Sequence, residues 1–116
     1  MTPMRTLIAL MLIALSGVTV ACSSNSPKAD PGPPFDTENQ AVIACMKHQP
    51  QPPGPRYTDD TIRQTGDTLA LLRYYTTNGT KQFCDGSAPT ETDRSWARLY
   101  VHFGADRRNV ASILDG

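Results

Sequence analysis

The sequence predicts an all-α protein whose folded part is a small three- to four-helix bundle. Two observations lead to this expectation. Apolar residues recur at helical spacing through the C-terminal two thirds of the chain, and residues suited to cap helices stand at the starts of these stretches. Because the chain has 116 residues, it has room for a single core, which we place in residues 36–116.

The first helix is expected over residues 37–48, with Asp36 as its N-cap and Glu38 in its first turn. Its apolar stripe consists of Val42, Cys45 and Met46. The proline-rich stretch that runs from Gln49 to Arg56 ends this helix, because proline lacks the N–H donor and fixes φ. We therefore expect an extended, rigid connector here.

The second helix is expected over residues 60–77, with Ile62, Leu69, Leu72 and Tyr75 at helix-compatible spacing. Gly66 weakens this helix or divides it. Asn78-Gly79 suits a left-handed C-cap. The same dipeptide, between RYYTT and TKQFC, is also compatible with a β-hairpin, and this alternative stays open.

Thr90 and Asp93 resemble a capping arrangement that opens the clearest helix, over residues 91–103. Its expected core stripe is Trp96, Leu99, Tyr100 and Phe103. Gly104 ends it. Asp106 is the expected cap of a last helix with a stripe of Val110, Ile113 and Leu114.

The N-terminus has the layout of an export signal, with a basic stretch at 1–5 and an apolar run at 7–15. Residues 18–22 (VTVAC) resemble the lipobox of bacterial lipoproteins. The resemblance implies that signal peptidase II cuts before Cys22 and that its thiol carries a diacylglycerol group, with palmitate-type acylation of the new amino group. Ordinary secretory cleavage and a membrane-spanning helix are the alternatives, although the apolar run is short for a span.

Three cysteines would leave one unpaired in an exported protein. If Cys22 carries lipid, Cys45 and Cys84 form an even pair, and a disulfide between them would persist in an oxidising compartment. A free or intermolecular thiol is the alternative. The fold expected is therefore a bundle cross-linked by one disulfide.

Between the lipid and the core, residues 23–35 are mostly Ser, Pro, Gly and Asp, a composition typical of a disordered tether. Glycosylation of this stretch, or binding of a partner to it, is the alternative. The expected organisation is a lipoprotein signal peptide at 1–21, the lipidated cysteine and tether at 22–35, and the helical domain at 36–116.

The charges balance, with 11 Lys+Arg and 11 Asp+Glu, which argues against a nucleic-acid partner. We expect an exported, non-catalytic binding module held by lipid on the outer side of the cell membrane, with an envelope protein as its partner. The candidate binding surface is Arg56, Tyr57, Arg73, Tyr74, Tyr75 and Trp96, since aromatics and arginine dominate interfaces. In a small bundle, most of these side chains could equally belong to the core.

Three stretches between residues 74 and 100 resemble small exported proteins of high-GC Gram-positive bacteria: YYTTNG at 74–79, FCDG at 83–86 and DRSWARLY at 93–100. This resemblance implies no known activity.

Two alternatives to the binding module remain. One is a small envelope hydrolase using His48 or His102 with a carboxylate such as Asp59 or Asp85. The other is a surface inhibitor or exclusion factor. The sequence shows no phosphate loop, metal-ligand cluster or Ser-His-Asp pattern, and we expect no cofactor and no metal.

Overall fold

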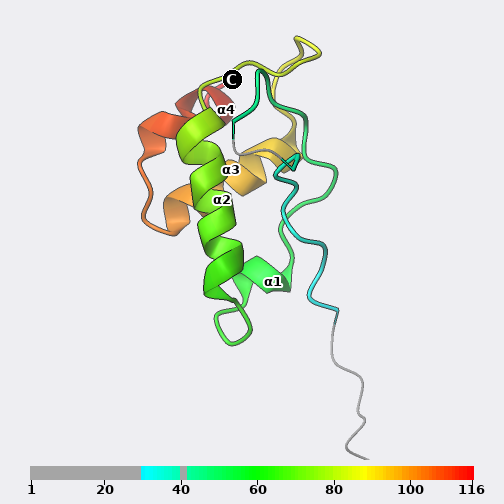
Figure 1. Ribbon diagram of the computed structural model, residues 1–116, viewed down its shortest axis with the longest axis vertical. Coiled ribbons are helices and arrows are strands. Elements are labelled where there is room, and N and C mark those ends of the chain that lie inside the picture. Colours follow the sequence, from blue (N-terminus) through cyan, green and yellow to red (C-terminus); the bar gives the residue numbers. More distant parts are fainter. Residues whose placement is uncertain (1–29, 40–41) are drawn as a thin grey trace, which may run out of the picture.

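The computed structural model describes residues 30–39 and 42–116. Over these ranges the ordered elements are helices: α1 (Pro55–Thr58), α2 (Thr65–Asn78), α3 (Glu91–His102), the 3-10 helix η2 (Arg107–Val110) and α4 (Ala111–Leu114). Helix α2 contacts α3 and η2, and α3 contacts α4 (Figure 1). The helical class is confirmed for this part of the chain. The expected leader, Cys22 and most of the tether lie outside the described residues.

The expected first helix is wrong, because the described residues between 36 and 49 form an irregular segment. Glu38 and Asn39 have φ values of 59° and 57°, which a right-handed helix excludes. Asp36 accepts a hydrogen bond from the Glu38 amide in an Asx turn instead of capping a helix. The Ile43 amide donates to the Asn78 side chain. Tertiary partners thus take backbone donors that a helix would use internally.

Ordered packing starts before the boundary expected at residue 36. Phe35 is 6% exposed and belongs to the core. The Arg56 amide donates to the Pro31 carbonyl at 2.8 Å, and the Arg56 Nε donates to the Gly32 carbonyl at 3.1 Å. Residues 31–35 are therefore part of the packed domain and not of the tether. The stretch is rich in proline, but its single aromatic residue, Phe35, is buried in the core and anchors it.

Aromatic rings form the centre of the core. The Phe35 ring lies 5.0 Å from Tyr74 and 4.8 Å from Trp96 between ring centroids, and Tyr57 meets Trp96 edge to face at 4.9 Å. The Tyr57 hydroxyl accepts a hydrogen bond from the Phe35 amide at 2.7 Å. Edge-to-face packing stabilises such clusters beyond the burial of area alone. The N-terminal segment is thereby fixed between α1, α2 and α3.

The connector and second helix differ in detail from the sequence expectation. Pro55 is the first residue of α1, where its missing N–H costs nothing, so the connector does not stay extended to Arg56. Helix α2 starts only at Thr65, and Ile62 and Leu69 are 44% and 43% exposed. Its buried residues are Leu71, Tyr74, Tyr75 and Asn78.

Helix α2 ends at Gly79, and the hairpin alternative is wrong. Gly79 has φ −64° and ψ −15°, so the expected left-handed cap is also wrong. Glycine is required here because other backbone atoms pack closely against it, and not because the chain makes a left-handed turn. A Cβ at this position would lie 2.2 Å from the Asn109 carbonyl oxygen.

The third helix is confirmed. Thr90 and Asp93 form a capping box at the start of α3, and Trp96, Leu99 and Tyr100 are buried. At the C-terminus, Asp106 accepts from the Arg108 amide as expected, but the first turn is the 3-10 helix η2.

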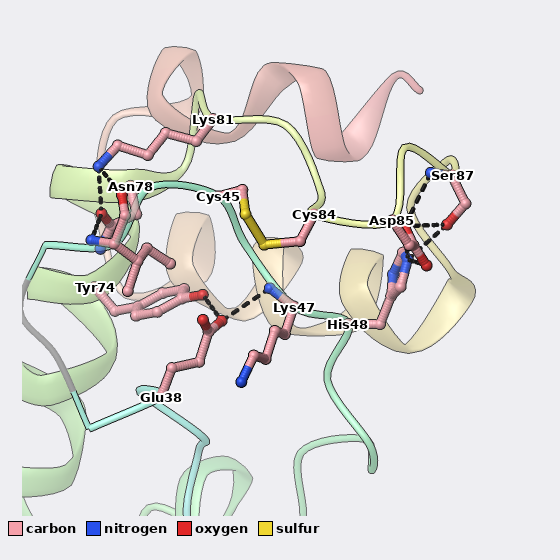
Figure 2. Close-up of a disulfide and its surroundings, with 11 residues drawn as sticks. Glu38, Cys45, Lys47, His48, Tyr74, Asn78, Lys81, Cys84, Asp85 and Ser87 are labelled. Carbon is pink, nitrogen blue, oxygen red and sulfur yellow. Dashed lines mark hydrogen bonds and ion pairs between the residues drawn. A yellow bond between two sulfur atoms is a disulfide. The ribbon is translucent and has the colours of Figure 1, made fainter.

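The disulfide between Cys45 and Cys84 is present and joins two positions with a sequence separation of 39 (Figure 2). A short parallel pairing lies beside it. The Met46 amide donates to the Gln82 carbonyl at 2.9 Å, and the Cys84 amide donates to the Met46 carbonyl at 2.8 Å. These contacts hold the irregular segment against the loop that follows α2.

Replacing Gly79 by alanine tests the close contact at the end of α2. The added Cβ would meet the Asn109 and Tyr75 carbonyl oxygens at 2.2 and 2.7 Å, so we expect Gly79→Ala to lower the free energy of unfolding by about 2 kcal/mol or more. The matched control is Gly66→Ala in the first turn of the same helix, where no atom lies within 4 Å and a gain of up to about 1 kcal/mol is expected. Urea denaturation measures both. Equal effects would contradict the packing argument.

Removing the disulfide tests its contribution to stability. For a separation of 39 residues the chain-entropy model gives about 4 kcal/mol, so Cys45→Ser/Cys84→Ser should lower the free energy of unfolding by up to that amount. Cys22→Ser is the control and should leave the unfolding midpoint unchanged. A midpoint unaffected by loss of both bridge cysteines would show that the cross-link adds nothing.

Candidate functional site

His48 lies where the parallel pairing brings residues 46–49 beside the loop that starts at Phe83. Its ring stacks on the Phe83 ring, with 4.2 Å between centroids and 11° between planes. Beyond the disulfide, Asp85 accepts hydrogen bonds from the Ser87 amide at 2.9 Å and the Ser87 hydroxyl at 2.8 Å. Gly86 between them has φ 73°, which a glycine adopts without strain. This turn presents Asp85 and Ser87 to the histidine.

Both imidazole nitrogens of His48 are engaged. Nδ1 lies 2.6 Å from Asp93 Oδ2. Nε2 lies 2.7 Å from the Ser87 Oγ and 3.1 and 3.2 Å from the two Asp85 carboxylate oxygens (Figure 2). We call these four residues the His48 cluster: His48, Asp85, Ser87 and Asp93.

Asp93 is the buried member of the cluster, with its side chain 2% exposed. Besides His48, its carboxylate accepts hydrogen bonds from the Gln49 amide at 2.8 Å and from the Thr90 amide and hydroxyl at 2.8 and 2.9 Å. Burial alone would raise the pKa of Asp93, but the hydrogen bonds from His48, Thr90 and Gln49 outweigh it and hold the pKa below its ordinary value. The carboxylate therefore stays ionised.

The charges around the ring favour its protonated form. The hydrogen bond to Asp93 raises the pKa of His48, desolvation opposes this, and Asp85 raises the pKa further. Hydrogen bonds from the Ser87 amide and hydroxyl, with a smaller contribution from His48, lower the pKa of Asp85. When protonated, His48 donates to a carboxylate on each side and ties the 85–90 loop to residues 46–49.

When neutral, the ring makes a different arrangement. A carboxylate that accepts from Nδ1–H fixes the tautomer with the lone pair on Nε2, and Ser87 Oγ lies within hydrogen-bond distance of that nitrogen. A serine hydroxyl, a histidine and a buried carboxylate in this order are the groups that activate a serine nucleophile. Asp85 is an additional carboxylate that competes for the same hydroxyl proton.

An open groove of about 550 Å³ runs beside the cluster, between the 80–89 loop and α4. Ser87 lies on its wall, whereas His48, Asp85 and Asp93 are not among its lining residues. The lining residues are Thr80, Lys81, Gln82, Phe83, Gly86, Ser87, Ala88, Pro89, Ser112 and Ile113.

The binding surface expected from the sequence is largely wrong. Tyr57, Tyr74 and Tyr75 are 2%, 3% and 2% exposed, and Trp96 is 1% exposed, because these rings form the core. The two arginines of the expected surface remain accessible. Arg56 is half-buried and lies 3.6 Å from Asp67, and Arg73 is exposed on α2.

Of the expected hydrolytic residues, the structure brings together His48 and Asp85. His102 lies elsewhere, in the last turn of α3, where its ring contacts Phe103. Asp59 accepts hydrogen bonds from the amide and hydroxyl of Thr61 and takes no part in the cluster. In the described ranges no three or more His, Cys, Asp or Glu side chains are arranged so that they could hold a metal ion. No helix there has the length and apolarity to cross a membrane.

Ser87 and Asp93 were missed in the sequence analysis, where no Ser-His-Asp pattern is evident. A usable signal exists in retrospect. His48 and Ser87 each stand three residues after a bridged cysteine, so segments running parallel from the disulfide bring them together. Asp93 is visible only as a capping residue.

Comparison of the chain with protein-family models, with curated proteins and with solved structures gave no match.

The pH dependence of stability tests the charged pairing of His48. Because its pKa is raised on folding, the histidine contributes stability that is fully present below the unfolded pKa, near 6.5, and is lost as pH rises through the higher folded pKa. We expect the urea midpoint of the native protein to fall as the pH rises from about 6.5 through the folded pKa of His48.

In His48→Gln this fall should be absent, whereas His102→Gln should keep it. The same slope in His48→Gln as in the native protein would assign the pH dependence to another group. NMR titration of the His48 ring protons gives the folded pKa directly.

Proposed function

We propose that this chain is an exported bacterial lipoprotein whose helical, disulfide-linked domain binds a protein of the cell envelope. The observation that carries the proposal is the use of the three cysteines. The disulfide takes Cys45 and Cys84, and the remaining cysteine, Cys22, stands at the end of the lipobox-like residues 18–22. Disulfides persist in oxidising compartments, which supports export.

The distance between the acylated residue and the domain supports a location close to the membrane. Within the described residues, Pro31 contacts the domain through the hydrogen bond from the Arg56 amide, and it stands nine positions after Cys22. A fully extended chain of nine residues spans at most about 30 Å. A domain on such a tether stays near the bilayer surface, where a partner in the same membrane or the adjoining cell wall is within reach.

Binding is favoured over other roles for the domain as a whole. The charge balance gives no electrostatic attraction for nucleic acid. Arg73 and the side chains of Ile62 and Leu69 are exposed and offer a mixed polar and apolar surface on and beside α2. Interfaces between proteins that also exist separately combine apolar and polar side chains in this way.

Substitution of Cys22 tests the anchor. In a bacterial host, the native protein should be found in the membrane fraction and incorporate labelled palmitate, whereas Cys22→Ala should lose the label and leave the membrane fraction. Cells treated with a cross-linker should give a discrete adduct with an envelope protein in the native case and much less in Cys22→Ala, because detachment lowers the local concentration.

Cys22→Ala with the Cys45–Cys84 disulfide intact is a matched comparison, since the variant keeps the folded domain. Unchanged membrane fractionation of this variant would refute the lipid anchor. Retained palmitate labelling without any cross-linked adduct would refute the binding role and leave the anchor standing.

A further inference from the structure

We propose that Ser87 is a nucleophile for acyl transfer, with His48 as its general base and Asp93 as the residue that positions the base. The inference goes beyond the binding role and does not depend on it. The substrate class is a carboxylic ester whose acyl part lies in the groove beside Ser87.

Distances support this assignment of roles. Ser87 Oγ to His48 Nε2 is 2.7 Å, and His48 Nδ1 to Asp93 Oδ2 is 2.6 Å, both within the range in which a proton passes between nucleophile, base and orienting carboxylate. Asp93 is held by three further donors, from Gln49 and Thr90. A carboxylate fixed in this way cannot turn, so the imidazole keeps one tautomer and one orientation.

The ring itself is held by stacking. Phe83 lies parallel to the imidazole at 4.2 Å, and the neighbouring parallel pairing fixes both backbones. Ser87 follows Gly86, on a turn that the disulfide anchors through Cys84. Nucleophile and base are thus carried by two segments that a covalent bond joins, which favours a constant geometry.

The groove supplies room for an acyl group beside Ser87. Its volume of about 550 Å³ lies within the usual range for small-molecule sites. Phe83, Ala88, Pro89 and Ile113 give it an apolar part suited to hydrocarbon. Ser112 and Gln82 give it a polar part for the remainder of the ester.

The reaction follows directly from these positions. Ser87 Oγ attacks the ester carbonyl carbon while its proton passes to Nε2 of neutral His48. The bond from that carbon to the alkoxy oxygen breaks, and the leaving alcohol takes the proton from Nε2. Water then attacks the acyl-serine with the same base, releasing the carboxylic acid and restoring the Ser87 hydroxyl.

Asp85 restrains the reaction in the resting state. The Ser87 hydroxyl lies 2.8 Å from Asp85 Oδ1 and 2.7 Å from His48 Nε2, so a rotation of the hydroxyl hydrogen alone transfers the bond from one acceptor to the other. The charged groups that face His48 are Asp93 on α3 and Asp85 on the loop. Both favour the imidazolium, which cannot accept the proton, so reactivity increases with pH.

Covalent labelling of the full-length, detergent-solubilised protein with an alkyl fluorophosphonate tests the proposal. Ser87 Oγ displaces fluoride from phosphorus, and peptide mass mapping locates the adduct. We expect labelling at Ser87, none at that peptide in Ser87→Ala, and a rate at least about 100-fold lower in His48→Gln. Ser95→Ala, on the exposed side of α3 away from the groove, is the control and should label as the native protein does.

Asp85→Asn separates a catalytic role from a purely structural one. Asparagine still accepts from the Ser87 amide, so the turn is kept, but one negative charge beside His48 is removed. The pH at half-maximal labelling rate should therefore fall below that of the native protein, and labelling at neutral pH should increase. If the His48 cluster only stabilises the fold, Ser87 should not be labelled at any pH.

Absence of an adduct on Ser87 in both the native protein and Asp85→Asn up to about pH 9 would overturn the proposal, as would equal labelling in His48→Gln when that variant is folded. If His48→Gln does not fold, the role of His48 is tested by whether Asp85→Asn shifts the pH profile of the Ser87 labelling rate. An unchanged profile would then exclude His48 as the base.

Discussion

One buried carboxylate joins the parts of this domain. Asp93 caps α3 through Thr90, accepts from the backbone of Gln49 and pairs with His48, so two segments far apart in the sequence, 48–49 and 90–93, meet on two oxygen atoms. Removing the partners of this carboxylate would lower the free energy of unfolding by several kcal/mol, because a buried ionised group is stabilised by the hydrogen bonds that replace its hydration. The disulfide acts nearby and on the same segments, and holds the loop that carries Asp85 and Ser87 next to this junction.

The sequence predicts the elements whose stability is local. Helix α3 follows from its capping residues and its apolar stripe, and the Asp106 turn follows from its side chain, because the signals lie within a few residues of the structure that they produce. The disulfide follows from a count of cysteines combined with the expectation that the chain is exported. None of these requires knowledge of the tertiary structure.

Where tertiary contacts decide, the sequence misleads. The segment before His48 has helix-like spacing, yet the side chains of Asn78 and Glu38 take up its amides and its residues adopt turns. The tyrosines that composition favours for an interface are core residues, because a domain of this size fills its interior with aromatic rings. Ser87 lies in no local catalytic motif, since His48 and Asp93 are 39 and 6 positions away in the chain, and only the equal spacing of His48 and Ser87 from the bridged cysteines relates them.

The position of Phe35 has a consequence for the order of folding. The N-terminal segment has no helix of its own before α1 in the described residues, and the Phe35 ring rests on rings from α2 and α3. During synthesis, the surface that supports Phe35 is complete only after residue 96 has been added to the chain. The packing of Phe35 therefore depends on contacts that are distant in the sequence, which slow the folding of a small domain.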